Sequence, residues 1–208
     1  LLTAGPIWDF DQTYGMSLVC SNDNPCGWTY LQNQDGCEDL NTMPRWWERL
    51  TADSVFTNML VSRWMNFRST FLHTDSILNW KDNNVAYIDA AKDRNFVRWP
   101  ILGTEIWIEP QPIPEDYPAE IQALKDWILK RVTWMDNNIA HIYDFTSFGG
   151  VKLYPNPTAE TLNVAIKSGG TVRIVDATGR LMWSSVDDCP DTAFQVDVSS
   201  WTIGTYFV

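Results

Sequence analysis

Two aspartates near the start of the chain, Asp9 and Asp11, have the residue type and spacing that could do chemistry. On an extended backbone, residues two apart point to the same side, so both carboxylates can face one hard divalent cation. Such an ion would relieve the repulsion between the two charges. The alternative is a structural turn in which the carboxylates accept backbone hydrogen bonds. The sequence therefore predicts that Asp9 and Asp11 are metal ligands, and it identifies no catalytic residue.

The segments on either side of this pair predict a strand, a turn and a loop. An apolar run over residues 1–8 predicts a strand, and Gly15 permits a backbone with positive φ. The loop that follows, residues 20–37, contains Cys20, Cys26 and Cys37, whereas Cys189 lies far away in sequence. In an oxidising compartment we expect a disulfide that cross-links this loop, although the spacing does not show which two cysteines form it. Free thiols are the alternative.

The region after the loop predicts helices. Apolar residues recur every three or four positions over residues 53–72, with Asp53 as the N-cap, and more weakly over residues 75–91. Residues 120–143 show the same period most clearly, after a group of prolines that cannot lie in the interior of a helix.

The hydrophobic period changes to about two after Gly149 and Gly150. Short apolar runs separated by turn residues then predict a small antiparallel Ig-like β-sandwich. We therefore expect an α+β chain with a helical domain over residues 1–148 and a β-sandwich domain over residues 151–208. The predicted strands are residues 162–166, 171–176, 181–184, 194–198 and 205–208.

Charge and hydropathy exclude two kinds of partner. The formal net charge of -11 argues against binding to nucleic acid, because phosphate contacts need clustered Lys and Arg. No apolar stretch approaches the roughly 18 residues that a membrane-spanning helix needs, so no membrane-spanning segment is expected.

Three motifs in the last 58 residues resemble the type A C-terminal sorting domain of type IX secretion (Por secretion system) substrates. They are Leu153-Tyr154-Pro155-Asn156-Pro157, Asp176-Ala177-Thr178-Gly179-Arg180 and Gly204-Thr205-Tyr206-Phe207-Val208, in the order of that family. The resemblance implies a Bacteroidetes-type envelope, recognition of residues 151–208 by an outer-membrane translocon and its shuttle protein, and secretion or display at the cell surface. It also implies that the domain is usually removed when the cargo is attached to the surface. An ordinary Ig-like accessory module is the alternative.

The first part of the chain resembles the C-terminal region of the CotH (spore coat protein H) kinase-like family. The resemblance covers roughly residues 3–145, apart from the cysteine loop. Its motifs are Gly5-Pro6-Ile7-Trp8-Asp9-Phe10-Asp11, Trp46-Trp47-Glu48-Arg49-Leu50 and Arg131-Val132-Thr133-Trp134-Met135-Asp136-Asn137-Asn138. It implies that Asp9 binds the Mg²⁺ that bridges ATP phosphates, with Asp11 as a second ligand.

Phosphoryl transfer also requires a phosphate-contacting lysine and a covering loop, which in this family precede the aspartates. The chain begins eight residues ahead of Asp9. We therefore expect these 208 residues alone to be inactive. ATP-dependent kinase activity stays an open alternative for a longer protein that contains them. The alternative is a catalytically dead surface-binding or structural protein on a kinase-like scaffold.

Overall fold

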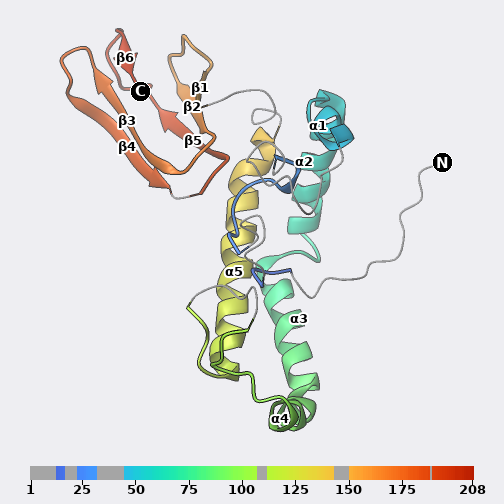
Figure 1. The fold of residues 1–208 in the computed structure, drawn as a ribbon. Helices are drawn as coiled ribbons and strands as arrows, with labels where there is room; N and C mark the ends of the chain where they lie inside the picture. Colours follow the sequence, from blue (N-terminus) through green and yellow to red (C-terminus); the bar gives the residue numbers. More distant parts are fainter. Residues whose placement is uncertain (1–12, 17–22, 32–44, 107–111, 143–149, 188) are drawn as a thin grey trace. The chain divides into compact units, whose positions relative to one another are not determined.

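A computed structural model of the chain describes residues 13–16, 23–31, 45–106, 112–142, 150–187 and 189–208 (Figure 1). The described residues confirm the predicted α+β class, with helices followed by two small antiparallel sheets. Their contacts define two compact units. The first unit draws on residues 1–25 and 63–133, and the second on residues 26–62 and 134–208. The sandwich therefore shares its unit with earlier segments, and the predicted division at residues 148–151 stays a prediction.

Helix α2 begins where the sequence predicts. The Asp53 carboxylate accepts hydrogen bonds from the backbone N–H groups of Val55 and Phe56, at 2.8 and 3.1 Å, and so caps the first turn. The described helices are α1 (Arg45–Thr51), α2 (Ser54–Arg68), α3 (Thr74–Tyr87), α4 (Asp89–Arg98) and α5 (Tyr117–Asn138), with 3-10 helices η2 (Thr29–Leu31) and η3 (Ile139–His141).

The prediction of one helix over residues 75–91 is wrong, because the structure divides this segment into α3 and α4. Ile88 lies between the two helices with φ −90° and ψ 3°. Its carbonyl accepts the N–H groups of Ala91 and Lys92, which starts a new helix. Asp89 then lies in the first turn of α4, where a negative charge is favourable, and pairs with Lys92 at 3.0 Å.

Helix α5 begins three residues before the predicted position. The Asp116 carboxylate accepts the backbone N–H of Ala119 at 2.9 Å and caps the helix. Pro118 fits here because a proline in the first turn removes no intrahelical hydrogen bond. Among the described helices, none is long and apolar enough to cross a membrane.

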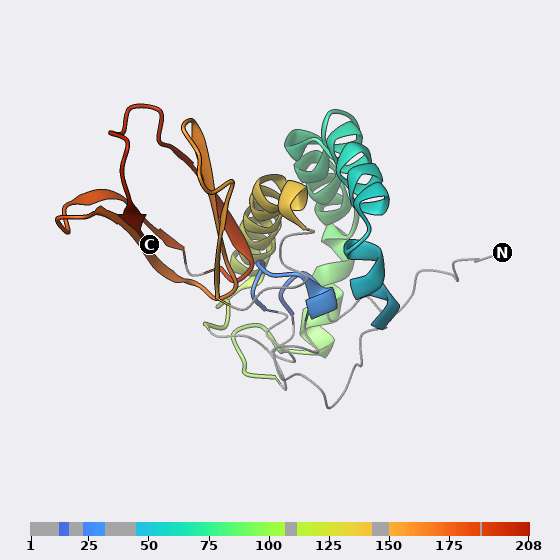
Figure 2. The same cartoon turned by 90° about the horizontal axis from the view of Figure 1, so that it is seen from above.

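The C-terminal sandwich consists of two three-stranded sheets (Figures 1 and 2). One sheet has the order β1-β2-β5 and the other β4-β3-β6, with every pairing antiparallel. The strands are β1 (Val151–Tyr154), β2 (Thr161–Ile166), β3 (Gly170–Asp176), β4 (Leu181–Asp187), β5 (Thr192–Asp197) and β6 (Tyr206–Phe207). All five strands predicted for the sandwich are present, and β1 is an addition that the sequence did not predict. The strand predicted over residues 1–8 lies outside the described residues.

Aliphatic residues from both sheets form the core of the sandwich. The buried cluster consists of Val164, Ile166, Val172, Ile174 and Val196, from β2, β3 and β5. The partly buried rings of Trp183 and Phe194 pack against this cluster, in an edge-to-face contact with centroids 5.5 Å apart. In β3 the buried Val172 and Ile174 alternate with the exposed Thr171 and Arg173, which is the period-two pattern on which the prediction of a sandwich rested.

Candidate functional site

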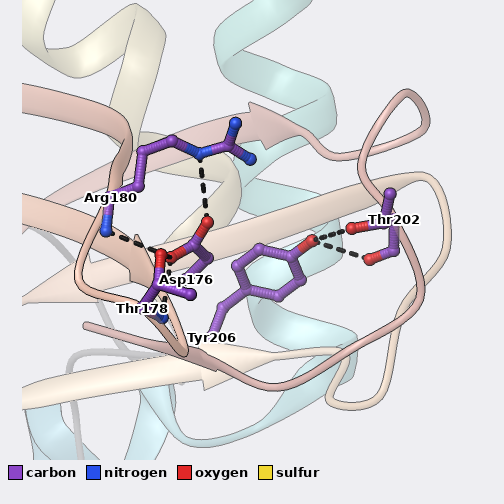
Figure 3. A network of polar contacts seen from close by, with 5 residues as sticks. All are labelled: Asp176, Thr178, Arg180, Thr202 and Tyr206. Carbon is purple, nitrogen blue, oxygen red and sulfur yellow. Dashed lines mark hydrogen bonds and ion pairs between the residues drawn. The ribbon is translucent and has the colours of Figure 1, made fainter.

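The turn between β3 and β4 is held by the side chain of Asp176 (Figure 3). Its Oδ1 accepts hydrogen bonds from the Thr178 hydroxyl at 2.6 Å, the Thr178 N–H at 2.9 Å and the Arg180 N–H at 3.1 Å. Its Oδ2 accepts from Nε of Arg180 at 3.0 Å. Gly179 has a φ of +83°, a conformation that glycine adopts at little cost. The aspartate, threonine, glycine and arginine of the second motif therefore each have a defined part in the turn.

These hydrogen bonds keep Asp176 ionised in strongly acidic solution. Donation from the Thr178 hydroxyl, supported by the backbone N–H groups of Thr178 and Arg180 and by the Arg180 charge, lowers the pKa of Asp176 from 3.8 to about 2. The Arg180 side chain stays largely exposed while it contacts the carboxylate.

The last strand joins this turn to the third motif. In the register of β3 with β6, Asp176 lies opposite Tyr206 and Val175 lies opposite Phe207. The Tyr206 hydroxyl donates to the Thr202 carbonyl at 2.6 Å, which closes the loop before β6 (Figure 3). The second and third sorting motifs therefore form one surface, although they are separate in sequence.

We call this region the distal end of the sandwich and define it as residues 155–160, 177–180 and 198–205, the connections that leave β1, β3 and β5. The distal end contains one positive and one negative charge, Arg180 and Glu160, and side chains beside and within it add apolar groups. Arg180 is accompanied by four exposed apolar residues, Leu181, Ile203, Phe207 and Val208. Exposed apolar side chains around a charged group are typical of a surface that binds another protein.

The opposite end of the sandwich, residues 167–169 and 189–192, is bonded to earlier parts of the chain, and we call it the docked end. Cys189 forms a disulfide with Cys26. Asp191, 1% exposed, accepts the N–H of Trp28 at 3.3 Å through its carboxylate and pairs with Nζ of Lys167 at 3.3 Å. Cys26 is therefore not part of a disulfide within the loop at residues 20–37, while Cys20 and Cys37 lie outside the described residues.

The end of helix α5 also contacts the docked end. Asn138, 1% exposed, accepts the backbone N–H of Ala193 in β5 at 2.8 Å, and its amide donates to the Trp134 carbonyl at 2.8 Å. The Trp134 ring lies edge to face with Trp28, with centroids 4.7 Å apart. The sequence did not identify Asn138 or Asp191 as important, because their partners lie 55 and 163 residues away.

The predicted metal ligands Asp9 and Asp11 lie outside the described residues. Residues 13–16, which follow this motif in sequence, are described, and they contact α5 through the Trp127 side chain. Tyr14 packs edge to face on the Trp127 ring, with centroids 5.8 Å apart. Gly15 has a φ of +88°, and a Cβ at this position would lie 2.5 Å from Cδ1 of Trp127. Gly15 is therefore required both by the backbone conformation and by the indole.

Arg131, from the helical motif of the CotH resemblance, lies one turn further along α5. Its guanidinium donates to the Pro25 carbonyl at 3.0 Å, and burial lowers its pKa. This contact agrees with the packing role that is expected for a partly buried arginine on the helix. Among the residues that the structure places, no three His, Cys, Asp or Glu side chains are grouped so that they could hold a metal ion.

The fold and the distal end define a small sandwich module at the end of a longer chain. Residues 152–208 match the family described as the secretion system C-terminal sorting domain. This module is the sorting domain of the type IX secretion system, and it indicates that the protein is a cargo of that system, secreted or on the cell surface. The chain matches none of the curated proteins and none of the solved structures. The CotH resemblance of residues 1–148 stays a prediction.

Proposed function

We propose that the distal end of the sandwich is the surface by which the outer-membrane translocon and its shuttle protein bind this cargo. The single observation that carries the proposal is the register of β3 with β6, which joins two motifs of the sorting domain on one surface. The docked end is bonded to Cys26 and Trp28, and the Ala193 N–H next to it is bonded to Asn138. A partner therefore has more access to the distal end than to the docked end.

The exposed guanidinium of Arg180 distinguishes the distal end chemically. Its Nε is already bonded to Asp176, so the group is held in one orientation before a partner arrives. Such preorganisation lowers the entropy cost of binding. We expect acidic and apolar side chains on the partner.

Export of the full chain from a bacterium with a type IX system tests this proposal. Arg180→Ala should shift protein from the cell surface and medium to the periplasm. Arg173→Ala, which removes another exposed arginine from the middle of β3, is the matched control and should be exported normally. Normal export of both variants would show that the distal end is not the recognised surface.

The N-terminal part has a second candidate function, as a piece of a CotH-like atypical kinase. The contact of Tyr14 and Gly15 with Trp127 favours it, because it joins the segment that follows the aspartate motif to the helix that carries the later motif of the same family. Asp9 would bind Mg²⁺ and thereby position ATP, with Asp11 as the second ligand. A scaffold without activity, used for binding or structure at the cell surface, is the competing function.

Nucleotide binding by the complete precursor separates these two functions. Asp9→Asn should abolish the binding of Mg·ATP, whereas Asp126→Asn, an equivalent change at an exposed position of α5, should not. An unchanged affinity in Asp9→Asn would refute the metal role of Asp9. A precursor that is exported but binds no Mg·ATP would instead support the inactive scaffold.

A further inference from the structure

The Cys26–Cys189 disulfide connects residues on either side of the junction between α5 and the sorting domain. The backbone passes from Ile142 through Gly150 into β1, and a cut here would free the C-terminal domain of an ordinary two-domain protein. We propose that the sorting domain of this protein stays attached after such a cut, and that its release requires reduction of the Cys26–Cys189 bond as well. This inference does not depend on which surface the export machinery binds.

The covalent part of the attachment follows from the order of residues along the chain. Cys26 lies before the junction and Cys189 after it, with a sequence separation of 163. A backbone cut after residue 142 and before residue 151 leaves the cysteines on different fragments, still joined through sulfur. Disulfides persist in secreted and cell-surface proteins, where the surroundings are oxidising, so the bond would survive at the destination of this cargo.

Buried polar contacts connect the same two fragments. The Trp28 N–H lies before the junction and its acceptor Asp191 after it, as do the Asn138 amide oxygen and its donor, the Ala193 N–H. Asn138 and Asp191 are each 1% exposed. Separation of the fragments would leave these groups without their partners, which is unfavourable. These contacts also hold the two cysteines close together, so the bond is favoured over open thiols.

Release by a dithiol reductant is a balanced exchange. A thiolate of the reductant attacks one sulfur of the bond, forms a mixed disulfide and expels the other cysteine as a thiolate, which takes up a proton. The second thiol of the reductant then attacks the mixed disulfide and frees the remaining cysteine. Two electrons pass to the Cys26 and Cys189 pair, and the reductant leaves as a cyclic disulfide.

The test uses the full chain with a site-specific protease sequence inserted between Gly149 and Gly150 and an affinity tag after Val208. The cut protein is bound through the tag and washed with urea, which removes non-covalent contacts. We expect the N-terminal fragment to stay on the resin without reductant, to run with the C-terminal fragment as one band on a non-reducing gel, and to elute on addition of dithiothreitol.

Two further measurements establish that the Cys26–Cys189 bond itself retains the fragment. Cys26→Ser should lose the N-terminal fragment in urea without reductant, and peptide mapping of the unreduced wild type should recover a Cys26–Cys189 cross-linked peptide. The dithiothreitol result uses wild-type protein and does not depend on folding of the variant. Loss of the N-terminal fragment from the unreduced wild type, or a map that pairs Cys189 with another cysteine, would overturn the proposal.

Discussion

Asn138→Ala should destabilise the contact between α5 and β5 by removing a buried amide with two partners. β5 is an edge strand of its sheet, and the Ala193 N–H donates to Asn138 at 2.8 Å. Loss of this acceptor leaves a partly buried donor unsatisfied, which costs about 1–3 kcal/mol, and the lost bond to the Trp134 carbonyl adds about 0.5–1.5 kcal/mol. We therefore expect the free energy of unfolding of this unit to fall by roughly 2–4 kcal/mol.

Urea unfolding followed by tryptophan fluorescence measures this loss, because Trp28 and Trp134 lie in contact beside the substitution. Hydrogen exchange gives a second readout at one atom. The Ala193 amide should exchange faster by roughly 30- to 700-fold, since each 1.4 kcal/mol corresponds to a factor of about ten.

The matched control is Asn137→Ala, the same substitution at the neighbouring, exposed position of α5. It should change stability by less than about 0.5 kcal/mol, as is usual for exposed sites. If the two variants unfold at the same urea concentration and the Ala193 amide keeps its protection, the hydrogen bond does not contribute as the geometry indicates.

Three further predictions address the other unit, the sandwich core and the turn. Gly15→Ala should lower the melting temperature more than Gly179→Ala, because both alanines bear a cost of about 1–2 kcal/mol at positive φ while only the first also collides with Trp127. Calorimetry that ranks them in the reverse order would contradict the Gly15 contact. Ile174→Ala should cost about 2–5 kcal/mol in urea unfolding, because this side chain is fully buried, and a cost under about 1 kcal/mol would be inconsistent with that burial. The depressed pKa of Asp176 stabilises the fold above pH 3.8, and this contribution should be lost as the pH falls through about 2. Amide shifts in the turn should follow that titration, and Asp176→Asn should abolish it.

Local patterns predicted most of the secondary structure. The sandwich strands were predictable because alternation of buried and exposed residues is a local signal, which β3 follows through Val172 and Ile174. β2 departs from it, because Val164, Ala165 and Ile166 are all buried. The break between α3 and α4 was missed because it contains neither glycine nor proline. It depends on the Ile88 backbone and on the new N-terminus at Asp89, which hydrophobic spacing does not record.

The candidate site was predictable only where its residues are neighbours in sequence. The Asp176 turn could be read from aspartate, glycine and arginine at turn spacing. The docked end could not, because a cysteine pattern gives no connectivity, and Cys26 pairs across 163 positions rather than within its own loop. The contact of Asn138 with β5 could not be predicted for the same reason. A single polar residue at the end of a helix does not show that its side chain accepts a hydrogen bond from a distant strand.

The position of the disulfide also determines how the chain carries mechanical load. Tension applied between the two termini passes along the backbone to Cys26, crosses the sulfur bridge to Cys189 and continues to the C-terminus. The separation of 163 positions corresponds to about 540–590 Å of extended backbone at roughly 3.3–3.6 Å per residue, and this length bears none of the tension while the bond is intact. Helices α1 to α5 and the first four strands of the sandwich all lie within this shielded length. A cargo drawn outward by its last residues would therefore be pulled through Cys26, with its helices and most of its sheets outside the path of the force.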